Sequence, residues 1–258
     1  MEDFEGELER GEADPVEGWD FGWFEGRATE ERTDWGYAGL LAERIAAAEA
    51  TLDVQTGGGE VYAGALAAAR ESAGRSPSAV RATDSYPPNL AIARERLAPY
   101  DGEVSACGND EPLPFAEGTF DLVSSRHPVS TAWGEVARVL RPGGTFLSQQ
   151  VGPGSNRGLY EFLLGPQPLD DRRSAENLAR GARDAGLAVL DLREQSTRVE
   201  FFDLASVVHF LRKVVWTVPG FTVDGYRDRL AALYDRIRME GSFVCHSERV
   251  LIVVRKPA

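Results

Sequence analysis

Thr51-Leu-Asp-Val-Gln-Thr-Gly-Gly-Gly-Glu60 is the stretch that decides the fold of this 258-residue chain. It begins as an apolar strand, reaches an acidic side chain at Asp53, passes through three consecutive glycines and enters a helical pattern at Glu60. Glycine lets the backbone turn tightly and approach a ligand closely. Because a strand, a glycine turn and a helix in succession leave backbone N–H groups at the helix N-terminus, the stretch predicts a site for a nucleotide-like ligand. The glycines do not follow the G-x-G-x-x-G spacing of dinucleotide-binding enzymes, so a nicotinamide enzyme is disfavoured.

The sequence around this stretch alternates between strand-like and helix-like segments. The predicted helices cover residues 35–50, 60–73, 87–97, 132–140 and 174–185. The predicted strands cover residues 52–54, 79–82, 103–107, 120–124, 145–151, 187–192 and 250–254. Strands that alternate with helices at this spacing imply right-handed crossovers and a parallel sheet, so we expect an α/β fold.

Composition and charge narrow the class of protein. Hydrophobic residues make up 43% of the chain, which predicts a substantial core. The formal net charge of −13 would repel phosphate backbones, so a nucleic-acid partner is disfavoured. The acidic N-terminus has no hydrophobic signal region, and no apolar run approaches the ~18 residues that a membrane span needs. Cys107 and Cys245 give neither a zinc spacing nor a disulfide framework. We therefore expect a cytoplasmic protein with reduced thiols, no metal site and no membrane partner.

Two segments fall outside the alternating pattern and predict how the chain is divided. Residues 1–34 are acidic and contain a cluster of aromatic residues, which predicts an arm that docks in part on the body. Residues 201–247 are mostly helical, rich in aromatics and broken at Pro219-Gly220, which predicts a cap or lid. The core would then comprise residues 35–200 plus 248–258. The aromatics of the cap either pack as helix faces usually do or form an apolar pocket for an acceptor.

Three motifs occur in an order that is typical of one enzyme family. The first is Asp53-x-Gln55-x-Gly57-x-Gly59. The second is Gly108-Asn-Asp-Glu-Pro-Leu-Pro-Phe115 followed by Gly118-Thr-Phe-Asp-Leu-Val123. The third is Arg138-Val-Leu-Arg-Pro-Gly-Gly-Thr-Phe146. Together they resemble the class I S-adenosylmethionine-dependent methyltransferases, most closely the type 11 branch, over about residues 36–155.

The resemblance implies a fold and a cofactor. The fold is a Rossmann-like, doubly wound sheet of seven strands, mostly parallel with the last strand antiparallel, and with a helical cap inserted between strands six and seven. The implied cofactor is S-adenosylmethionine. The sulfonium of this cofactor is already a reactive methyl donor, so the protein mainly aligns a nucleophile with it and excludes water.

The resemblance also assigns residues to the methionine end of the cofactor. The turn beneath it corresponds to Asp53, Gln55, Gly57 and Gly59. Gln55 stands where the family has its first glycine. Its side chain therefore points away, contacts the methionine end or blocks binding. The segment Trp35-Gly-Tyr37, just before the first long helix, either closes over the cofactor or forms a hydrophobic staple.

The nucleoside end is assigned to residues that follow the next two strands. Asp84 ends the second strand, where an adenosine-type ligand needs a carboxylate for its ribose hydroxyls; the alternative is a helix N-cap. Ser85 follows it directly. Asn109 replaces the family's usual Asp beside the adenine amino group, and an Asn oxygen can still accept that bond. Asp110 would offer its backbone N–H to the ring.

The residues after the fourth strand are assigned to the neighbourhood of the methyl group. Ser125 and Arg126 would line the cofactor there. His127 is the best-placed general base if the acceptor is a hydroxyl or a phenol, and the alternative is a structural histidine held by a hydrogen bond.

These assignments predict a methyltransferase that acts on an O, N or C nucleophile of a small molecule. One alternative is an RNA methyltransferase of the rRNA guanine type, although that group carries an N-terminal zinc module that the two cysteines of this chain cannot build. Another is a non-catalytic binding module in which Gln55 has removed cofactor binding. The sequence leaves the acceptor and the oligomeric state open.

Overall fold

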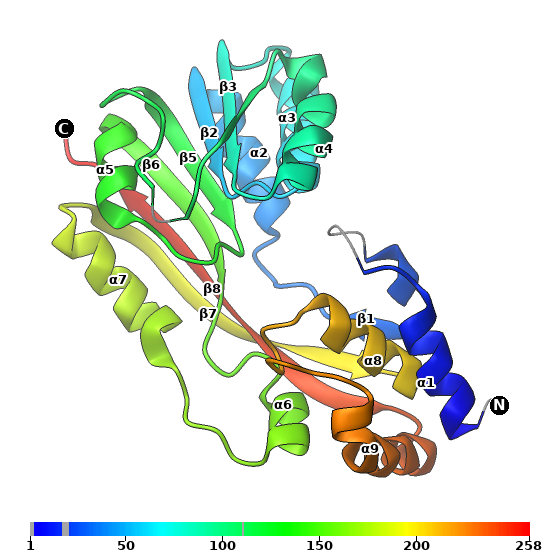
Figure 1. Cartoon of the computed structure of the whole chain (residues 1–258). Coiled ribbons are helices and arrows are strands. Elements are labelled where there is room, and N and C mark those ends of the chain that lie inside the picture. Colours follow the sequence, from blue (N-terminus) through cyan, green and yellow to red (C-terminus); the bar gives the residue numbers. More distant parts are fainter. Residues whose placement is uncertain (1–2, 17–20, 110) are drawn as a thin grey trace. The chain divides into compact units, whose positions relative to one another are not determined.

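The computed structural model describes residues 3–16, 21–109 and 111–258 (Figure 1). Within these residues the strands form one eight-stranded sheet in the order β1-β7-β8-β6-β5-β2-β3-β4. The strands are β1 (Ala28–Glu30), β2 (Ala50–Val54), β3 (Ala79–Asp84), β4 (Glu103–Ala106), β5 (Phe120–Arg126), β6 (Leu140–Val151), β7 (Ala188–Phe201) and β8 (Phe243–Arg255). The helices are α1 (Phe4–Ala13), α2 (Tyr37–Ala47), α3 (Glu60–Ala73), α4 (Pro87–Leu97), α5 (Trp133–Val139), α6 (Arg157–Leu164), α7 (Ala175–Asp184), α8 (Leu204–Lys213) and α9 (Arg227–Glu240).

The strand pairing confirms the predicted fold class. β2 pairs in parallel with β3 and with β5, β3 pairs in parallel with β4, and β5 pairs in parallel with β6. The last strand, β8, is antiparallel to β6. The strand that the sequence did not predict is β1, a three-residue strand from the N-terminal segment that pairs antiparallel with the end of β7. The chain therefore has the predicted Rossmann-like sheet with one short strand added at an edge.

The chain divides into two compact units. The core unit comprises Thr33–Gly152, Asp171–Gln195 and Arg249–Ala258. The other, which we call the lobe, comprises Met1–Arg32, Pro153–Asp170 and Ser196–Glu248.

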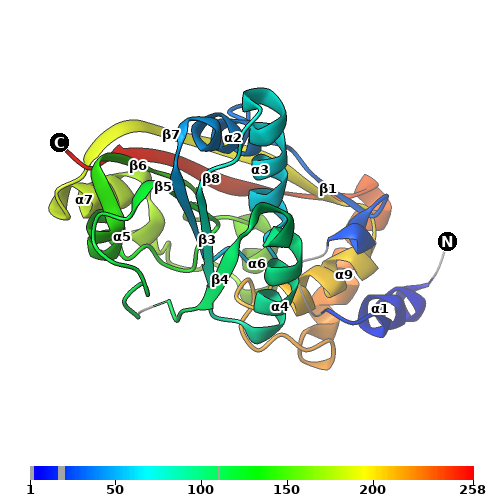
Figure 2. The ribbon, with the colours of Figure 1, turned by 90° about the horizontal axis from the view of Figure 1, so that it is seen from above.

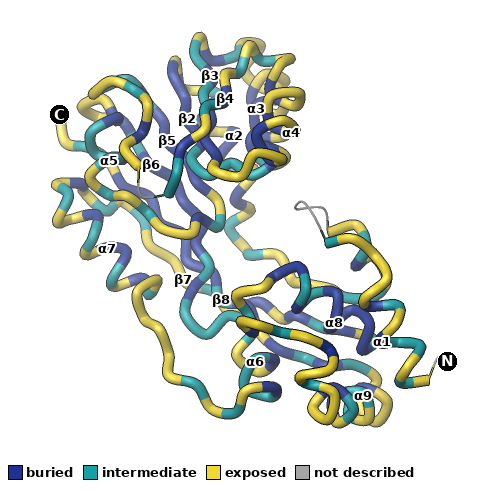
Figure 3. The backbone as a smooth tube through the Cα atoms, viewed as in Figure 1, coloured by how far each residue is buried: buried dark blue, intermediate teal, exposed yellow. Residues whose placement is uncertain are grey.

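Alternate residues of the strands in the core unit bury their side chains on opposite faces of the sheet, as the two-residue period of a strand requires. Leu122 and Leu147 belong to a hydrophobic cluster with α2, α3 and α4. Their neighbours Val123 and Phe146 belong to a second cluster with α5 and α7. Figure 2 shows α3 and α4 on one side of β3 and β4, with α5 and α7 on the other, and Figure 3 shows buried residues along β5 and β6. Helices on both faces leave the carboxyl ends of the parallel strands as the open edge for a ligand.

The third sequence motif forms a tight junction between α5 and β6. Prediction placed the strand at 145–151, whereas β6 begins at Leu140, directly after α5 ends. The register between β5 and β6 shifts there, and Gly143 has a φ of 81°. A Cβ on Gly144 would lie 3.0 Å from the carbonyl oxygens of Arg141 and Phe120, so only glycine fits without displacing backbone. The Pro-Gly-Gly run is thus part of the strand start rather than a loop.

The last two predicted strands are much longer than the sequence indicated. Residues 187–192 were predicted, and β7 runs from Ala188 to Phe201; residues 250–254 were predicted, and β8 runs from Phe243 to Arg255. Beyond residue 196, β7 shows the alternation of a half-buried strand, with Thr197, Val199 and Phe201 buried. The predicted cap began at residue 201, so the last buried position of this alternation, Phe201, was assigned to the cap.

The lobe has its own hydrophobic core. It is formed by α1, α6, α8 and α9 with the adjoining ends of β7 and β8. The N-terminal aromatics Trp23 and Phe24 pack on α8, a part of the predicted cap, where the centroids of their rings lie 4.1 and 5.4 Å from that of His209. Trp19 lies outside the described residues. No helix among the described residues is long and apolar enough to cross a membrane.

Helices α1 and α8 are in unusually close contact at Gly11. A Cβ there would lie 2.7 Å from Cβ of Val208 and 2.8 Å from the carbonyl oxygen of Ala205. At the adjoining end, the backbone N–H of Leu204 donates to Glu7 over 2.7 Å, and that of Ser206 donates to Asp203 over 2.7 Å. The first turn of α8 is therefore capped partly by α1, which explains why the acidic N-terminal segment folds as a helix.

Gly11→Ala is expected to lower the free energy of unfolding by about 1–3 kcal/mol, because the methyl group has no space between the two helices. Gly64→Ala is the matched control. Gly64 is also inside a helix, α3, but nothing lies within 4 Å of the site of its Cβ. Alanine should stabilise that helix by about 0.5–1 kcal/mol. Chemical denaturation of the two variants measures both values; equal values would contradict the close contact between the helices.

Candidate functional site

The glycine turn between β2 and α3 favours glycine for backbone reasons at two of its three positions. Gly57 and Gly59 have φ values of 63° and 77°, in the left-handed region. A Cβ on Gly58 would lie 2.5 Å from Oε1 of Glu60 and 2.9 Å from Nη1 of Arg96. The same guanidinium donates to the carbonyl oxygen of Gly58 over 2.6 Å. The turn is thus held from the α4 side by Arg96, a residue that the sequence analysis did not select.

Asp84 holds the turn from the end of β3. One oxygen of its carboxylate accepts from the backbone N–H of Gly57 over 2.8 Å. The other accepts from the backbone N–H of Tyr86 over 2.9 Å and from Nδ2 of Asn89 over 3.2 Å. The residue is only 7% exposed. Asp84 is not the N-cap of α4, because that position is Tyr86 and has no side-chain cap bond. The carboxylate instead joins the residues before and inside α4 to the glycine turn, with acceptor capacity left for a further donor, and its ribose role stays a prediction.

Asp53 is a buried carboxylate at the end of β2. It accepts a hydrogen bond from the Ser124 hydroxyl over 2.6 Å. Burial raises the pKa of Asp53 to about 6, and the bond from Ser124 opposes part of that rise. Such a group is easily ionised by a cation placed beside it, because the positive charge offsets the cost of burial.

Two buried hydroxyls near Asp53 form no close hydrogen bond within the protein, although the Thr56 hydroxyl lies near enough to the Asp53 carboxylate to lower its pKa. They are the phenol of Tyr37, at the start of α2, and Oγ1 of Thr56, in the glycine turn. Burial and the neighbouring charge of Asp53 raise the pKa of Tyr37 well above its usual value, so the phenol stays protonated. Buried polar groups are normally paired, so two unpaired hydroxyls next to one carboxylate indicate a place for a polar ligand.

Gln55 connects the glycine turn to the loop after β5. Its Oε1 accepts from the backbone N–H of Val129 over 2.6 Å, and its Nε2 donates to the carbonyl oxygen of Ser130 over 2.9 Å. Its φ is 56°, a conformation that costs a non-glycine residue about 1–2 kcal/mol. Two well-formed side-chain hydrogen bonds offset a cost of that size. The side chain that replaces the family's glycine therefore has a defined structural partner.

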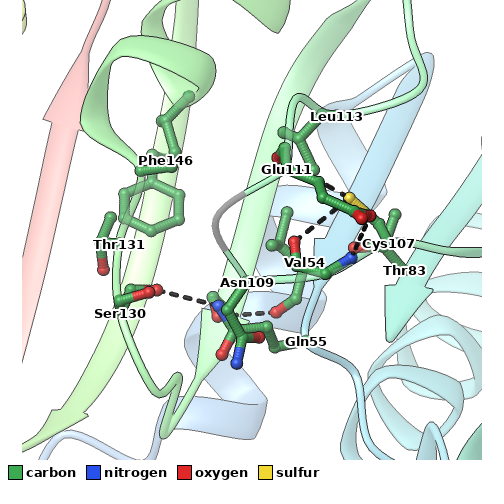
Figure 4. A pocket seen from close by; sticks show the side chains of 14 residues that line it. Val54, Gln55, Thr83, Cys107, Asn109, Glu111, Leu113, Ser130, Thr131 and Phe146 are labelled. Carbon is green, nitrogen blue, oxygen red and sulfur yellow. Dashed lines mark hydrogen bonds between the residues drawn. The ribbon is translucent and has the colours of Figure 1, made fainter. Parts of the chain in front are cut away.

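A pocket of about 460 Å³, partly open to solvent, lies at this edge of the core unit (Figure 4). Three of the predicted site residues line it: Gln55, Asn109 and Ser125. Apolar lining residues that the sequence analysis missed are Val54, Leu113, Ala132, Val136 and Phe146. Polar ones that it missed are Thr83, Cys107, Glu111, Ser130 and Thr131. An apolar wall with polar groups at its margin is the usual lining of a small-molecule site.

The second and third motifs bind each other at the wall of this pocket. Arg138 on α5 donates to the carbonyl oxygens of Leu113 and Phe115, over 2.9 and 2.7 Å. Glu135 accepts from the backbone N–H of Leu113 over 2.7 Å and pairs with Arg138. The hydrogen bond from Arg138 holds the pKa of Glu135 below its usual value. The loop that carries Asn109 is thus fixed to α5, whereas Asp110 lies outside the described residues.

His127 is a neutral ring whose proton position follows from its neighbours. The Trp35 indole N–H can only donate, and it donates to Oε1 of Gln149 over 2.8 Å. The other end of that amide is therefore the NH₂ group, which lies 3.0 Å from Nε2 of His127. Nε2 must then accept, and the ring proton sits on Nδ1. Burial, with Arg126 and Arg249 nearby, holds the pKa of His127 well below its usual value.

This arrangement matches the alternative role predicted for His127, that of a structural histidine held by a hydrogen bond. In the conformation described, the one lone pair of the ring is occupied by Gln149, so the ring has none to take a proton from an acceptor. The remaining predicted residues, Ser85 and Arg126, are exposed and do not line the pocket. Nor do five other predicted residues, namely Asp53, Gly57, Gly59, Asp84 and His127. The hydroxyl of Ser125 is bound to the carbonyl oxygen of Val54 over 2.7 Å. Within the described residues, no three His, Cys, Asp or Glu side chains are grouped so that they could hold a metal ion.

Comparison with known proteins agrees with the motifs. Residues 52–148 match the family model for a type 11 methyltransferase domain. Over 169 residues the chain is 28% identical to the biotin biosynthesis bifunctional protein BioHC of Cellvibrio japonicus. The match covers 58% of this chain and 33% of that protein, so the chain spans about a third of the length of this curated relative.

Solved structures share the fold at low sequence identity. A protein of unknown function from Deinococcus radiodurans is 15% identical, with a TM-score of 0.60 and coverage of 89% of this chain and 90% of that one. The partner of the Trm112 methyltransferase activator in a Haloferax volcanii complex is 20% identical, with a TM-score of 0.52. That match covers 99% of this chain and 96% of the other, so it includes both the core unit and the lobe.

Proposed function

We propose that this chain transfers a methyl group from S-adenosylmethionine to an O, N or C nucleophile of a small molecule, because residues 52–148 match the family model for a methyltransferase domain. The observation that carries the proposal is the turn at Gly57, which is held by the same carboxylate, Asp84, that the family uses for the ribose.

The residues present suit each part of the cofactor. Asp84 has acceptor capacity left for ribose hydroxyls. The apolar wall around Leu113, Val136 and Phe146 suits the flat base, and Asn109 at its margin suits the amino group of that base. Asp53, Tyr37 and Thr56 offer a buried carboxylate and two unpaired hydroxyls to the charged methionine end. When bound, the cofactor supplies an electrophilic methyl group; the chain supplies binding, orientation and exclusion of water.

General-base catalysis by His127 stays a conditional part of the proposal. The ring becomes a base only if the Gln149 amide turns away from Nε2. We therefore propose that alignment of the acceptor, rather than proton abstraction, is the main contribution of this edge of the sheet. An acceptor that is already ionised, or whose attacking atom carries a free lone pair, suits such a site.

A small-molecule acceptor is favoured over RNA by two observations. The net charge of −13 disfavours a phosphate backbone, since binding to one depends on basic residues. The curated relative is described as a biotin biosynthesis protein. The RNA alternative predicts binding that weakens steeply as salt rises.

The test is incubation of the purified chain with isotope-labelled S-adenosylmethionine and, separately, a metabolite extract or total RNA, followed by mass spectrometry. Label in a small molecule, and its absence when the Asp84→Ala variant replaces the wild type, is the expected result. Label in RNA would support the alternative. If calorimetry detected no cofactor binding, the proposal would be overturned and the non-catalytic binding module would be the remaining hypothesis.

We also propose that the lobe selects the acceptor, as the predicted cap at 201–247 would. Deleting that segment is a poor test, because α8 and α9 share one hydrophobic core with α1 and α6. Val215 and Trp216, which follow α8 and are 58% and 59% exposed, offer a milder change. Val215→Ser with Trp216→Ala should raise the KM for the acceptor and leave the affinity for S-adenosylmethionine unchanged; weaker cofactor binding would contradict the assignment.

A protein partner is a further proposal, supported by the match that covers nearly all of both chains. Its counterpart from Haloferax volcanii was solved in complex with the Trm112 methyltransferase activator. We propose that this chain also binds a small activator of that kind. Coexpression with the Trm112-type protein of the same genome should give one co-eluting complex; separate elution of two soluble proteins would exclude this partner.

A further inference from the structure

We propose that Gln55 is a positioning residue that holds the loop after β5, residues 127–131, as a preformed wall of the ligand pocket. The proposal rests on the proposed function of this site and deepens it. Gln55 departs from the family motif, and its side chain does not point away into solvent. It ends in two hydrogen bonds to the backbone of this loop.

The contacts are directional and complementary. Val129 donates its backbone N–H to Oε1, and Ser130 accepts from Nε2 through its carbonyl oxygen, over 2.6 and 2.9 Å. The amide of one glutamine thus satisfies a donor and an acceptor on adjacent residues, as a strand partner would. Because Trp35 fixes the Gln149 amide that contacts His127, the preceding end of the loop is tied down separately.

The two ends of the loop have other contacts, since the backbone N–H of His127 donates to the carbonyl oxygen of Gln149 over 2.7 Å and the Thr131 hydroxyl accepts from Gln150 over 3.0 Å. Its middle, Val129 and Ser130, has few other means of holding its position. Val129 is 64% exposed, and Ser130 is exposed as well. Within the part of the chain that the structure describes, the backbone N–H of Val129 donates to Gln55. Ser130 and Thr131 nevertheless line the pocket together with Gln55. The position of the middle of that wall, Val129 and Ser130, therefore depends on the Gln55 side chain, while Thr131 is also held by Gln150.

The geometry explains why glutamine can replace the family's glycine. With glycine in the turn, this loop would have to be ordered by the ligand, and the ordering would weaken binding. With Gln55 it is ordered in advance. The expected signature is slow ligand dissociation, since the loop must release its two bonds before that wall can open.

The first test is amide hydrogen exchange measured by NMR without ligand. The Val129 amide should be protected in the wild type and should exchange about tenfold or more faster in Gln55→Leu, which keeps the side-chain size but makes neither bond. Gln55→Gly, the residue that the family motif has there, should behave as Gln55→Leu does. Val129→Ala is the control, because it trims an exposed side chain and keeps both backbone bonds.

The second test is the dissociation rate of S-adenosylhomocysteine in stopped-flow experiments. Gln55→Leu should release it about five- to tenfold faster, with a smaller change in the association rate. Gln55→Glu keeps an acceptor for Val129 but loses the donor to Ser130, so it should give an intermediate rate. A Val129 amide that is unprotected in the wild type, or equally protected in Gln55→Leu and Gln55→Gly, would overturn the proposal. A protected amide in a protein that binds no S-adenosylhomocysteine would instead refute the proposed function.

Discussion

Asp84→Ala is expected to reduce the affinity for S-adenosylmethionine about 100-fold or more and to lower the free energy of unfolding by about 2–4 kcal/mol. The carboxylate is buried and accepts from the backbone N–H groups of Gly57 and Tyr86 and from Asn89. Alanine would leave these donors without an acceptor, and each buried donor left unpaired costs about 1–3 kcal/mol. The cofactor would lose its ribose partner and the fixed position of the turn together.

Asn89→Ala is the matched control for this prediction. It removes one donor and leaves the carboxylate bound to Gly57 and Tyr86, so cofactor affinity should stay within about threefold of the wild type. Calorimetry gives the affinities and urea denaturation the free energies of unfolding. Wild-type affinity in Asp84→Ala would remove this carboxylate from the site.

Asp53 is expected to make the ligand-free protein less stable as the pH rises from about 4 to about 6. Burial raises the pKa of Asp53 from 3.8 to about 6. Between these two values the unfolded chain has lost the proton and the folded chain still holds it, so stability falls with rising pH. The rise in pKa corresponds to about 3 kcal/mol, all of it lost above pH 6. Cofactor affinity should change in the opposite direction, because a cationic ligand prefers the ionised carboxylate.

Asp53→Asn isolates this contribution from the other carboxylates. The amide keeps an oxygen that can accept from Ser124 and cannot ionise. The difference in free energy of unfolding between variant and wild type should grow from near zero at pH 4 to about 3 kcal/mol at pH 7, with the variant the more stable. Urea denaturation across that pH range measures it. A difference that does not change with pH would show that Asp53 ionises as an exposed carboxylate does.

The part of the fold that the sequence predicted best is the part where local chemistry dictates geometry. The predicted helices 60–73 and 87–97 have the bounds of α3 and α4, since glycine or proline marks their ends. Residues of the second and third sequence motifs also contact each other in the structure. Asp121, in the second motif, accepts from the backbone N–H groups of Glu49 and Ala50 and pairs with Arg141 of the third motif.

The lobe could not be predicted because its elements depend on distant partners. α1 is rich in Glu and Gly and becomes a helix because it fits against α8 and caps it. The far ends of β7 and β8 are buried by that same lobe core. Tertiary contacts of this kind override local propensity and leave no periodic signal in one segment alone.

Prediction of the candidate site was limited in the same way, because the contacts of single side chains also depend on distant partners. Three of the residues assigned to the cofactor from the sequence, Gln55, Asn109 and Ser125, line one pocket. The sequence could not state that Gln55 would bind Val129, because the hydrogen-bond partner comes from a loop 74 residues away. It also could not assign the proton on His127, which depends on the orientation of a glutamine amide on β6.

The side-chain amide of Gln149 determines which ring nitrogen of His127 carries the proton. Replacing the NH₂ group of that amide by an oxygen would therefore change the protonation of His127. Gln149→Glu would keep an acceptor for Trp35 but would present a second acceptor to Nε2 of His127. The ring proton would then move to Nε2, Nδ1 would gain a lone pair, and the new carboxylate would raise the pKa of the ring. Nitrogen chemical shifts of the imidazole would show this reversal of tautomer. A histidine locked in one protonation form by its neighbour could thus become a titrating group without any change to the histidine itself.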